Sequence, residues 1–170
     1  MLDALVHDGD LATVSAPLDL LAIQYYGVTG VDSSGQSVQL YPTSDAPWQQ
    51  VHPEGMYETL VRVRDDYPGA PALVVTENGI PDRTPAGTTD DTERLEFLRA
   101  HLQQVARAVA DGVDVQAYYA WSLLDNVEWA EGLDQRWGLV HVDFETQERT
   151  PKTSARWYAD VVAQGAVPPA

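Results

Sequence analysis

Cysteine is absent from this chain of 170 residues, so a disulfide framework and thiolate chemistry are both excluded. Basic residues are scarce: Lys and Arg number 10 against 26 Asp and Glu, which gives a formal net charge of −16. Nucleic-acid binding needs clustered basic side chains that contact the phosphates. The composition therefore excludes a nucleic-acid partner and predicts a solvated acidic surface.

Long apolar runs are absent too. No stretch approaches the ~20 apolar residues that a membrane span requires, so we expect no membrane partner. Residues 1–10 contain early acids and lack a basic region, and we therefore expect no signal peptide. Lys152 is the only lysine, and this preference for arginine suggests a GC-rich bacterial genome. The resulting expectation is a cytoplasmic bacterial protein.

No pattern in the sequence indicates a cofactor. The four histidines are scattered along the chain and show no metal-ligand spacing. A Gly-rich phosphate loop is absent, and no Ser-His-Asp set can be assembled. We expect the protein to bind neither a metal nor another cofactor.

Three apolar runs, each opened by Gly or Pro, are present: residues 18–26, 72–76 and 113–121. Near-continuous apolar runs of this length are typical of parallel strands that are buried on both faces. Residues 27–53, between the first two runs, are polar and contain several Gly, Ser and Pro. That composition predicts a long loop with a short hairpin.

Helical periodicity separates the runs. Residues 55–67 and 89–110 carry apolar side chains at spacings of three or four, which predicts two helices that face a core. Thr89 or Asp90 is the expected N-cap of the longer helix, and a last helix is expected at 153–163.

Strands that alternate with helices predict a parallel α/β architecture. Right-handed crossovers would place the carboxyl ends of all three strands at one edge of the sheet. A complete (β/α)8 barrel needs at least ~200 residues, so the length excludes a full barrel.

The most informative stretch is residues 74–79, an apolar run that breaks at Glu77 and continues as Asn-Gly. An α/β barrel has its chemistry at the carboxyl ends of its strands, where Glu77 is expected to lie. The third run ends in a similar way. It reaches Trp121 and is followed within a few residues by Glu128 and Trp129.

Four motifs carry a resemblance to a known family. They are DLLAIQYY at 19–26, LVVTENG at 73–79, WSLLDNVEW at 121–129, and the segment from QRWGL to WY at 135–158. In this order they resemble the carboxyl-terminal part of glycoside hydrolase family 1, the β-glucosidase family. The resemblance implies an α/β fold that is a partial (β/α)8 TIM barrel of three C-terminal βα units, barrel strands six to eight. Residues 1–170 would then form one incomplete domain.

The resemblance also implies roles for individual residues. Glu77 matches the nucleophile, and Tyr26 is expected to support it through a hydrogen bond. The substrate-binding residues would be Trp121, Glu128, Trp129, Trp137 and Gln24.

The residues themselves leave alternatives open at several positions. Trp121 and Trp129 could be core tryptophans, and Glu128 could be a surface acid. The alternative is a sugar site, because aromatic faces suit the apolar face of a sugar and a carboxylate accepts hydrogen bonds from its hydroxyls. For Trp137 core packing is an equal alternative. Trp48 lies in the long loop and is expected either to line the pocket entrance or to be a surface aromatic. Asp125 and Asn126 are expected to fix their loop through local hydrogen bonds.

The sequence departs from the family at three positions: Gln24 stands in place of Asn, Trp137 in place of Phe, and Leu133 in place of a common Tyr. The family's acid/base glutamate lies in an N-E-P motif, and this chain contains no N-E-P. A retaining glycosidase needs two carboxyl groups, so the chain is expected to be nearly inactive alone.

Three hypotheses follow. The chain is a fragment of a β-glucosidase, a subunit of a split barrel, or a non-catalytic sugar-binding module. Its expected partners are a β-glycoside or oligosaccharide substrate, together with an N-terminal barrel fragment or further copies of itself. The presence of Glu77 argues against the pure binding module, which would not need a nucleophile.

Overall fold

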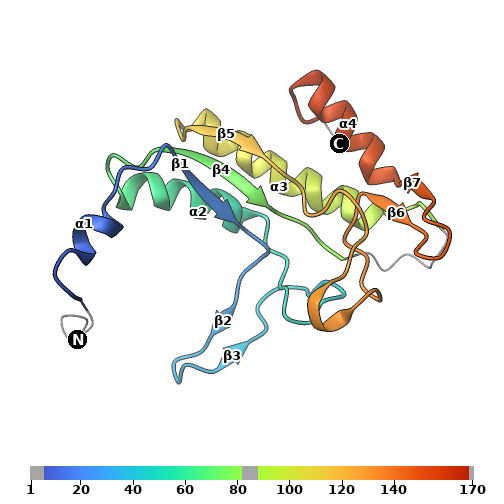
Figure 1. Ribbon diagram of the computed structural model, residues 1–170, viewed down its shortest axis with the longest axis horizontal. Coiled ribbons are helices and arrows are strands. Elements are labelled where there is room, and N and C mark those ends of the chain that lie inside the picture. The colour runs from blue at the N-terminus through green and yellow to red at the C-terminus, as the bar shows by residue number, and fades with distance from the viewer. Residues whose placement is uncertain (1–5, 82–87, 169–170) are drawn as a thin grey trace.

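A three-stranded parallel sheet forms the centre of the computed structural model, which describes residues 6–81 and 88–168 (Figure 1). Strands β1 (Leu20–Gln24), β4 (Ala72–Glu77) and β5 (Val115–Tyr118) lie in the order β1-β4-β5. The three expected strands are confirmed, but β1 and β5 are shorter than their apolar runs. Within the described residues β1 and β5 each pair only with β4. Each strand therefore ends where its hydrogen bonding to β4 ends. Residues 1–5, on which the expectation about a signal peptide partly depends, lie outside the described ranges.

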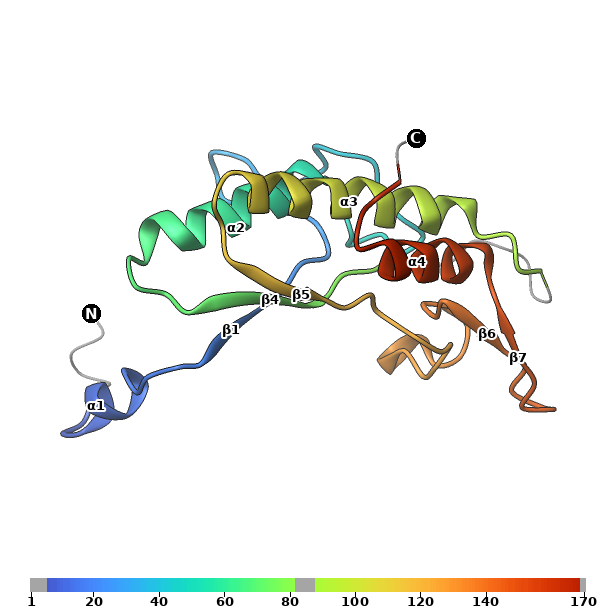
Figure 2. The same cartoon turned by 90° about the horizontal axis from the view of Figure 1, so that it is seen from above.

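Helices α2 (Glu54–Asp66) and α3 (Thr92–Ala110) pack against one face of the sheet, as Figure 2 shows. Buried apolar side chains join these helices to the strands, with Leu60 from α2, Val105 from α3 and Val75 from β4 in one core cluster. Helix α4 (Thr153–Gln164) packs beside α3. None of the helices in the described ranges is long and apolar enough to cross a membrane.

The amino end of α3 differs from the expectation of a cap at Thr89 or Asp90. Asp91 is the N-cap residue, and its carboxylate is directed elsewhere: it accepts hydrogen bonds from Arg94 at 2.6 Å and from the backbone N–H of Ser154 at 2.8 Å. The carbonyl of Thr89 accepts from the N–H of Thr153 at 2.8 Å. These bonds to the start of α4 hold residues 89–91 outside the helix.

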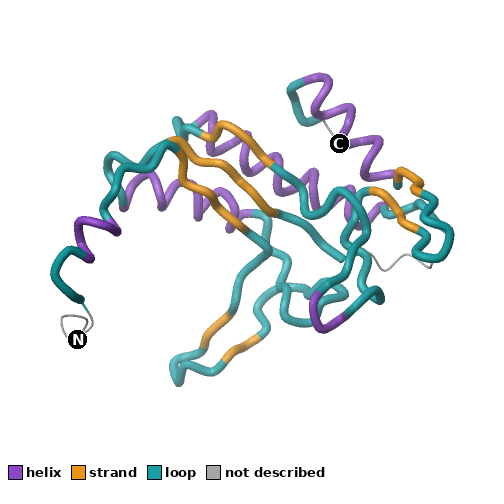
Figure 3. The backbone as a smooth tube through the Cα atoms, viewed as in Figure 1, coloured by secondary structure: helices purple, strands orange, loops and turns teal. Residues whose placement is uncertain are grey.

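Smaller elements extend from this core. The hairpin expected in the long loop is present as β2 (Gly30–Val31) and β3 (Ser37–Val38). A second hairpin, β6 (Val140–Val142) with β7 (Arg149–Pro151), and the short helix α1 (Asp10–Val14) were not expected. Figure 3 shows that loops make up most of the chain beyond the carboxyl ends of the strands.

The sheet face opposite the helices is open, as Figure 2 also shows. Leu20 on β1 is 52% exposed and Tyr119, just after β5, is 58% exposed. In the part of the chain that the structure describes, no strand pairs with the outer edge of β1 or of β5. Unpaired strand edges and an exposed apolar face are features of a surface that another polypeptide covers.

A buried histidine generates the first prediction. His101 on α3 is fully buried; its Nδ1 lies 2.7 Å from the carbonyl of Phe97, and its Nε2 has no hydrogen-bond partner within the described residues. Burial lowers the pKa of His101 from 6.5 to about 4. The unfolded chain therefore takes up a proton near pH 6.5 while the folded chain stays neutral, so the free energy of unfolding should fall as the pH drops from 6.5 towards 4.

A His101→Leu variant should lose this part of the pH dependence. Urea unfolding of both proteins at several pH values in that window measures it, with the difference between the two curves as the signal. Parallel curves for the wild type and the variant would show that His101 is not the group that titrates.

Candidate active site

The carboxyl ends of the strands bring two acidic or polar positions together. Glu77 is the last residue of β4, and Gln24 is the last residue of β1 and its partner in the register of the pair. The chain then turns at Asn78 and Gly79. A side chain at position 79 could not be accommodated, because a Cβ there would lie 1.9 Å from the carbonyl oxygen of Trp121. The Asn-Gly pair after Glu77 thus lets the β4 and β5 loops approach each other closely.

Glu77 accepts a hydrogen bond at Oε2 from the hydroxyl of Tyr26, at 2.8 Å. Burial of the phenol, followed by its bond to Glu77, raises the pKa of Tyr26 far above its usual value of 10.0. Tyr26 is consequently a neutral donor at any physiological pH. This donor fixes the orientation of the Glu77 carboxylate.

A cavity of about 220 Å³ opens beside Glu77. Most of its lining comes from residues that the sequence had pointed to, and the complete lining is Tyr26, Trp48, Glu77, Trp121, Glu128, Trp129 and Trp137. The last residue of β4 and the segments after β1 and β5 all contribute. The structure therefore brings together side chains that lie up to 111 positions apart in the sequence, from Tyr26 to Trp137.

Gln24 is the one expected site residue outside this lining. It is exposed, and a register shift between Ile23 and Gln24 separates it from the regular part of the β1–β4 pair. Trp48, which the sequence left open, is part of the lining and is 61% exposed.

Aromatic rings form the wall next to Tyr26. The ring of Trp137 meets that of Tyr26 edge-on at 5.8 Å, and the rings of Trp137 and Trp48 stack at 6.3 Å. Trp137 is only 2% exposed although it lines the cavity, so it both packs and presents an edge to the pocket. Broad aromatic faces of this kind suit an apolar ligand surface with few polar groups.

The second carboxylate in the cavity is Glu128. Burial raises its pKa above the usual value of 4.5; a hydrogen bond from Trp121 opposes the shift, and the charge of Glu77 adds to it. Trp129, the next residue, begins a single 3-10 turn with φ of 42° and is 91% exposed. The charge of Glu77 therefore acts on Glu128, whereas Trp129 is almost fully exposed at the edge of the cavity.

Hydrogen bonds near the neck of this loop agree with the expected roles of Asp125 and Asn126. The amide of Asn126 donates to the Ser122 hydroxyl at 2.9 Å and to the Leu124 carbonyl at 3.0 Å. The carboxylate of Asp125 accepts from the N–H of Gly138 at 2.9 Å. Only the bonds of Asn126 are local, because Asp125 also accepts from Val142 and from Lys152 farther along the chain.

Two buried amides of the site were missed from the sequence. Asn78 donates to the Tyr25 carbonyl at 2.6 Å and accepts from the Tyr118 hydroxyl at 2.5 Å. Gln49 donates to the carbonyls of Tyr26 at 2.8 Å and of Gly79 at 2.7 Å. Nothing local marks Gln49 in the sequence, but Asn78 stands directly after Glu77 and could have been recognised as a brace.

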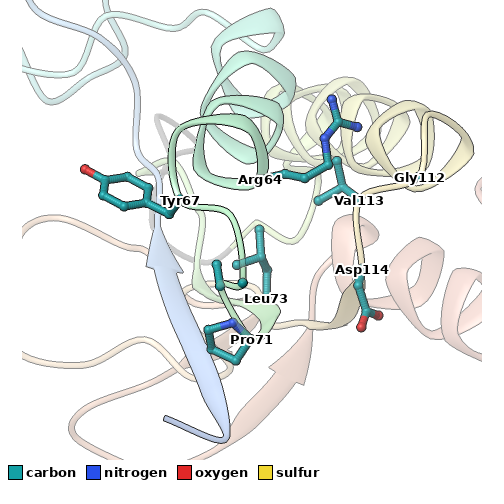
Figure 4. A pocket seen from close by; sticks show the side chains of 9 residues that line it. Arg64, Tyr67, Pro71, Leu73, Gly112, Val113 and Asp114 are labelled. Atoms are coloured by element: carbon teal, nitrogen blue, oxygen red, sulfur yellow. The ribbon is translucent and has the colours of Figure 1, made fainter. Parts of the chain in front are cut away.

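Another cavity, of about 150 Å³, lies at the opposite end of the strands (Figure 4). It is lined by Leu73 near the start of β4 and by Val113 before β5. Arg64 at its rim is engaged with the Asp65 carboxylate and the Asp111 carbonyl. In barrel-like α/β folds this end of the strands serves stability, so the cavity beside Glu77 is the candidate active site.

Comparison with known proteins identifies the family. The model of glycosyl hydrolase family 1 matches residues 4–166. This chain belongs to that family. The resemblance seen in the four motifs is thereby confirmed, and the fold is a partial α/β barrel of family 1.

Individual relatives support the same assignment. The chain is 42% identical to a bifunctional β-D-glucosidase/β-D-fucosidase of Bifidobacterium breve, across 93% of this chain and 40% of that protein. It is 39% identical to a 6-phospho-β-galactosidase of Streptococcus equi subsp. zooepidemicus, across 81% of this chain and 29% of that protein. The solved family 1 β-glucosidase of Thermotoga maritima superposes with a TM-score of 0.84 at 34% identity, across 94% of this chain and 38% of that one. The family 1 chain described here thus spans less than half the length of each.

The paired carboxylates generate the second prediction. A Glu77→Gln variant should lower the pKa of Glu128, because it removes a negative charge that disfavours ionisation of Glu128. Titration of the Glu128 carboxyl carbon by NMR measures the change. Glu131→Gln is the matched control, since Glu131 acts on Glu128 more weakly than Glu77 does. An equal shift in both variants would contradict the proximity of Glu77 and Glu128.

Proposed function

We propose that this family 1 chain supplies the nucleophile and the sugar-binding loop of a retaining β-glycosidase. The observation that carries the proposal is the cavity in which Glu77, with the Tyr26 hydroxyl on its Oε2, stands among four tryptophans. A nucleophilic carboxylate has to be held still and aimed at the anomeric carbon, and a strand end with a fixed donor meets this need. A β-glucoside is the proposed substrate class, in line with the names of the Bifidobacterium and Thermotoga relatives.

The chemistry would take two steps. In the first, a Glu77 oxygen bonds to the anomeric carbon, the glycosidic C–O bond breaks, and an acid protonates the departing oxygen. In the second, water attacks the anomeric carbon, gives its proton to the same group acting as base, and releases Glu77 from the ester.

Glu128 is the one other carboxylate in the lining of the cavity, and we assign it to binding. Glu128 lines the cavity together with Trp121 and Trp129, so its oxygens suit sugar hydroxyls rather than proton transfer to a leaving group. Among the described residues that line the cavity no further carboxylate is available, so we propose that the acid/base comes from another polypeptide. In a retaining enzyme it would stand about 5–5.5 Å from Glu77.

We further propose that residues 1–170 are the three carboxyl-terminal βα units of the barrel, and that β1, β4 and β5 are its strands six to eight. The share of about 40% of the relatives' length supports this, as do the open outer edges of β1 and β5. A polypeptide that carries the remaining five units would pair with both edges and bring the acid/base. In its absence we expect no turnover, and the open edges favour self-association.

Complementation tests the nucleophile. The chain is co-expressed with the amino-terminal 60% or so of a full-length family 1 relative, a length chosen as the complement of the matched share. Turnover of a chromogenic β-glucoside is expected from the mixture and not from either part. Glu77→Gln should then reduce turnover on the order of 10³-fold or more, because it removes the nucleophile.

A 2-fluoro glycoside that traps the glycosyl-enzyme ester should label Glu77 in the same mixture. Glu131→Gln, outside the cavity lining, serves as the control that leaves turnover intact. Turnover that survives Glu77→Gln, or a label on another residue, would refute the assignment.

Binding by the loop is tested separately. Trp129→Ala should weaken the affinity for gluconolactone about tenfold, the scale of one aromatic contact. Since Trp129 is 91% exposed, the free energy of unfolding should change by less than about 0.5 kcal/mol. Glu128→Ala should weaken affinity further by removing an acceptor for sugar hydroxyls.

Calorimetric titration and a melting curve are recorded on each sample. Tyr67→Ala is the matched control, because Tyr67 is an exposed aromatic residue at the opposite end of the strands. A lower melting temperature with unchanged affinity in Trp129→Ala would mean that Trp129 is only structural.

A further inference from the structure

The only lysine of this acidic chain is buried. Lys152 lies between β7 and α4, is 1% exposed, and has its Nζ 3.1 Å from Oδ1 of Asp125, which is itself buried. Lysine is normally a surface residue, and removing two charges from water is unfavourable unless their geometry compensates. A buried ion pair adds little to stability compared with well-packed apolar residues, so its presence calls for another explanation.

The carboxylate of Asp125 contacts more than the lysine. Its Oδ1 also accepts from the N–H of Gly138 at 2.9 Å, and its Oδ2 accepts from the N–H of Val142 at 3.3 Å. Arg136 Nη1 and His141 Nδ1 each lie 3.4 Å from the same Oδ2. Asp125 thus stands at one end of the segment 126–137 and binds the backbone just beyond its other end.

This neck of the segment is tightly closed. A Cβ at position 138 would lie 2.1 Å from the N of Asp125, so the two backbones approach as closely as a glycine allows. Ser122 donates through its N–H to the Trp137 carbonyl at 3.0 Å, and Lys152 donates through its own N–H to the Leu139 carbonyl at 3.0 Å. The backbone of Lys152 is therefore anchored at Leu139, just before β6, while its side chain contacts Asp125.

The segment 126–137 carries Glu128, Trp129 and Trp137, which are three of the side chains that line the cavity beside Glu77. We infer that the buried Lys152–Asp125 pair is a positioning device that fixes the neck of the 126–137 loop and so sets where these three side chains stand relative to Glu77. The functional meaning of the three side chains rests on the proposed function. The fixing of the neck does not.

Fixing the neck requires a side chain that accepts several hydrogen bonds at once. A carboxylate has two oxygens that accept several hydrogen bonds at once, so a single side chain satisfies two backbone N–H groups and a lysine. Two apolar residues would pack in the same space but would leave those N–H groups without a partner. Lys152 follows the loop in the sequence, and its ammonium group neutralises the buried charge of Asp125.

Hydrogen exchange tests the device without any ligand. In Asp125→Asn the side-chain amide presents a donor where one oxygen accepted, and in Lys152→Met the stem remains while the charge is lost. We expect exchange of the Gly138 and Val142 amides to become about tenfold faster or more in both variants, with parallel changes across 126–137. Leu60→Ala, a core cavity between α2 and the sheet, is the control that lowers stability elsewhere.

A double variant, Asp125→Asn with Lys152→Met, covers the case in which a single variant fails to fold, because no unpaired charge is then buried. It should fold, show the same local acceleration, and bind gluconolactone at least about tenfold more weakly than the wild type. Leu60→Ala should lose melting temperature with unchanged affinity. A wild-type chain that binds no sugar would refute the proposed function and leave the exchange result to decide the device.

Two outcomes would overturn the inference. One is a double variant that does not fold, since a positioning pair must be dispensable for folding. The other is exchange in 126–137 that stays at the wild-type rate in Asp125→Asn or Lys152→Met, or that rises no more there than in Leu60→Ala.

Discussion

One buried amide joins the carboxyl ends of all three parallel strands. Asn78 is fully buried one residue after Glu77; it donates to the Tyr25 carbonyl beyond β1 and accepts from the Tyr118 hydroxyl at the end of β5. Strand pairing alone ends at these positions, so the amide continues the cross-linking where the loops begin. An unpaired amide in this place would be unfavourable, which makes the arrangement hard to distort. These bonds fix the backbone directly after Glu77, the last residue of β4.

The sequence predicted the parts of this protein that depend on local pattern. Apolar runs bounded by Gly and Pro located the three strands, and a spacing of three or four located α2 and α3, because these periods follow from backbone geometry alone. The last helix, α4, was expected from the start signal at Thr150-Pro151. The same reasoning placed Glu77 at a strand end. Trp121, Glu128 and Trp129 were expected to share a site with it, and the cavity brings all three beside it.

What the sequence did not predict depends on contacts between distant residues. The N-cap of α3 is Asp91 and not Thr89 or Asp90, because Arg94 and Ser154 donate to the Asp91 carboxylate. Ser154 is distant in the sequence, so a rule based on neighbouring residues could not predict this contact. Gln49 braces Tyr26 and Gly79 from a loop whose path is irregular. Gln24 lies on the exposed side of β1 together with Leu20 and Ala22, outside the cavity lining, and its expected role in binding substrate stays a prediction.

Some residues of the site lie at or next to the ends of strands and others lie on a loop, and this division follows from the fold. Glu77 and Tyr26 belong to strand ends that Asn78 and Gln49 hold by short hydrogen bonds. Glu128 and Trp129 belong to a loop whose two ends Asp125 joins through the N–H of Gly138. Preorganised groups on strands suit covalent chemistry, in which a small displacement is unfavourable, whereas a loop suits adaptable contacts with hydroxyls. The sheet face opposite the helices is open (Figure 2), and it is the face that the polypeptide proposed above would cover. This division agrees with the proposal above, in which Glu77 on a rigid strand end is the nucleophile and another polypeptide supplies the proton transfer.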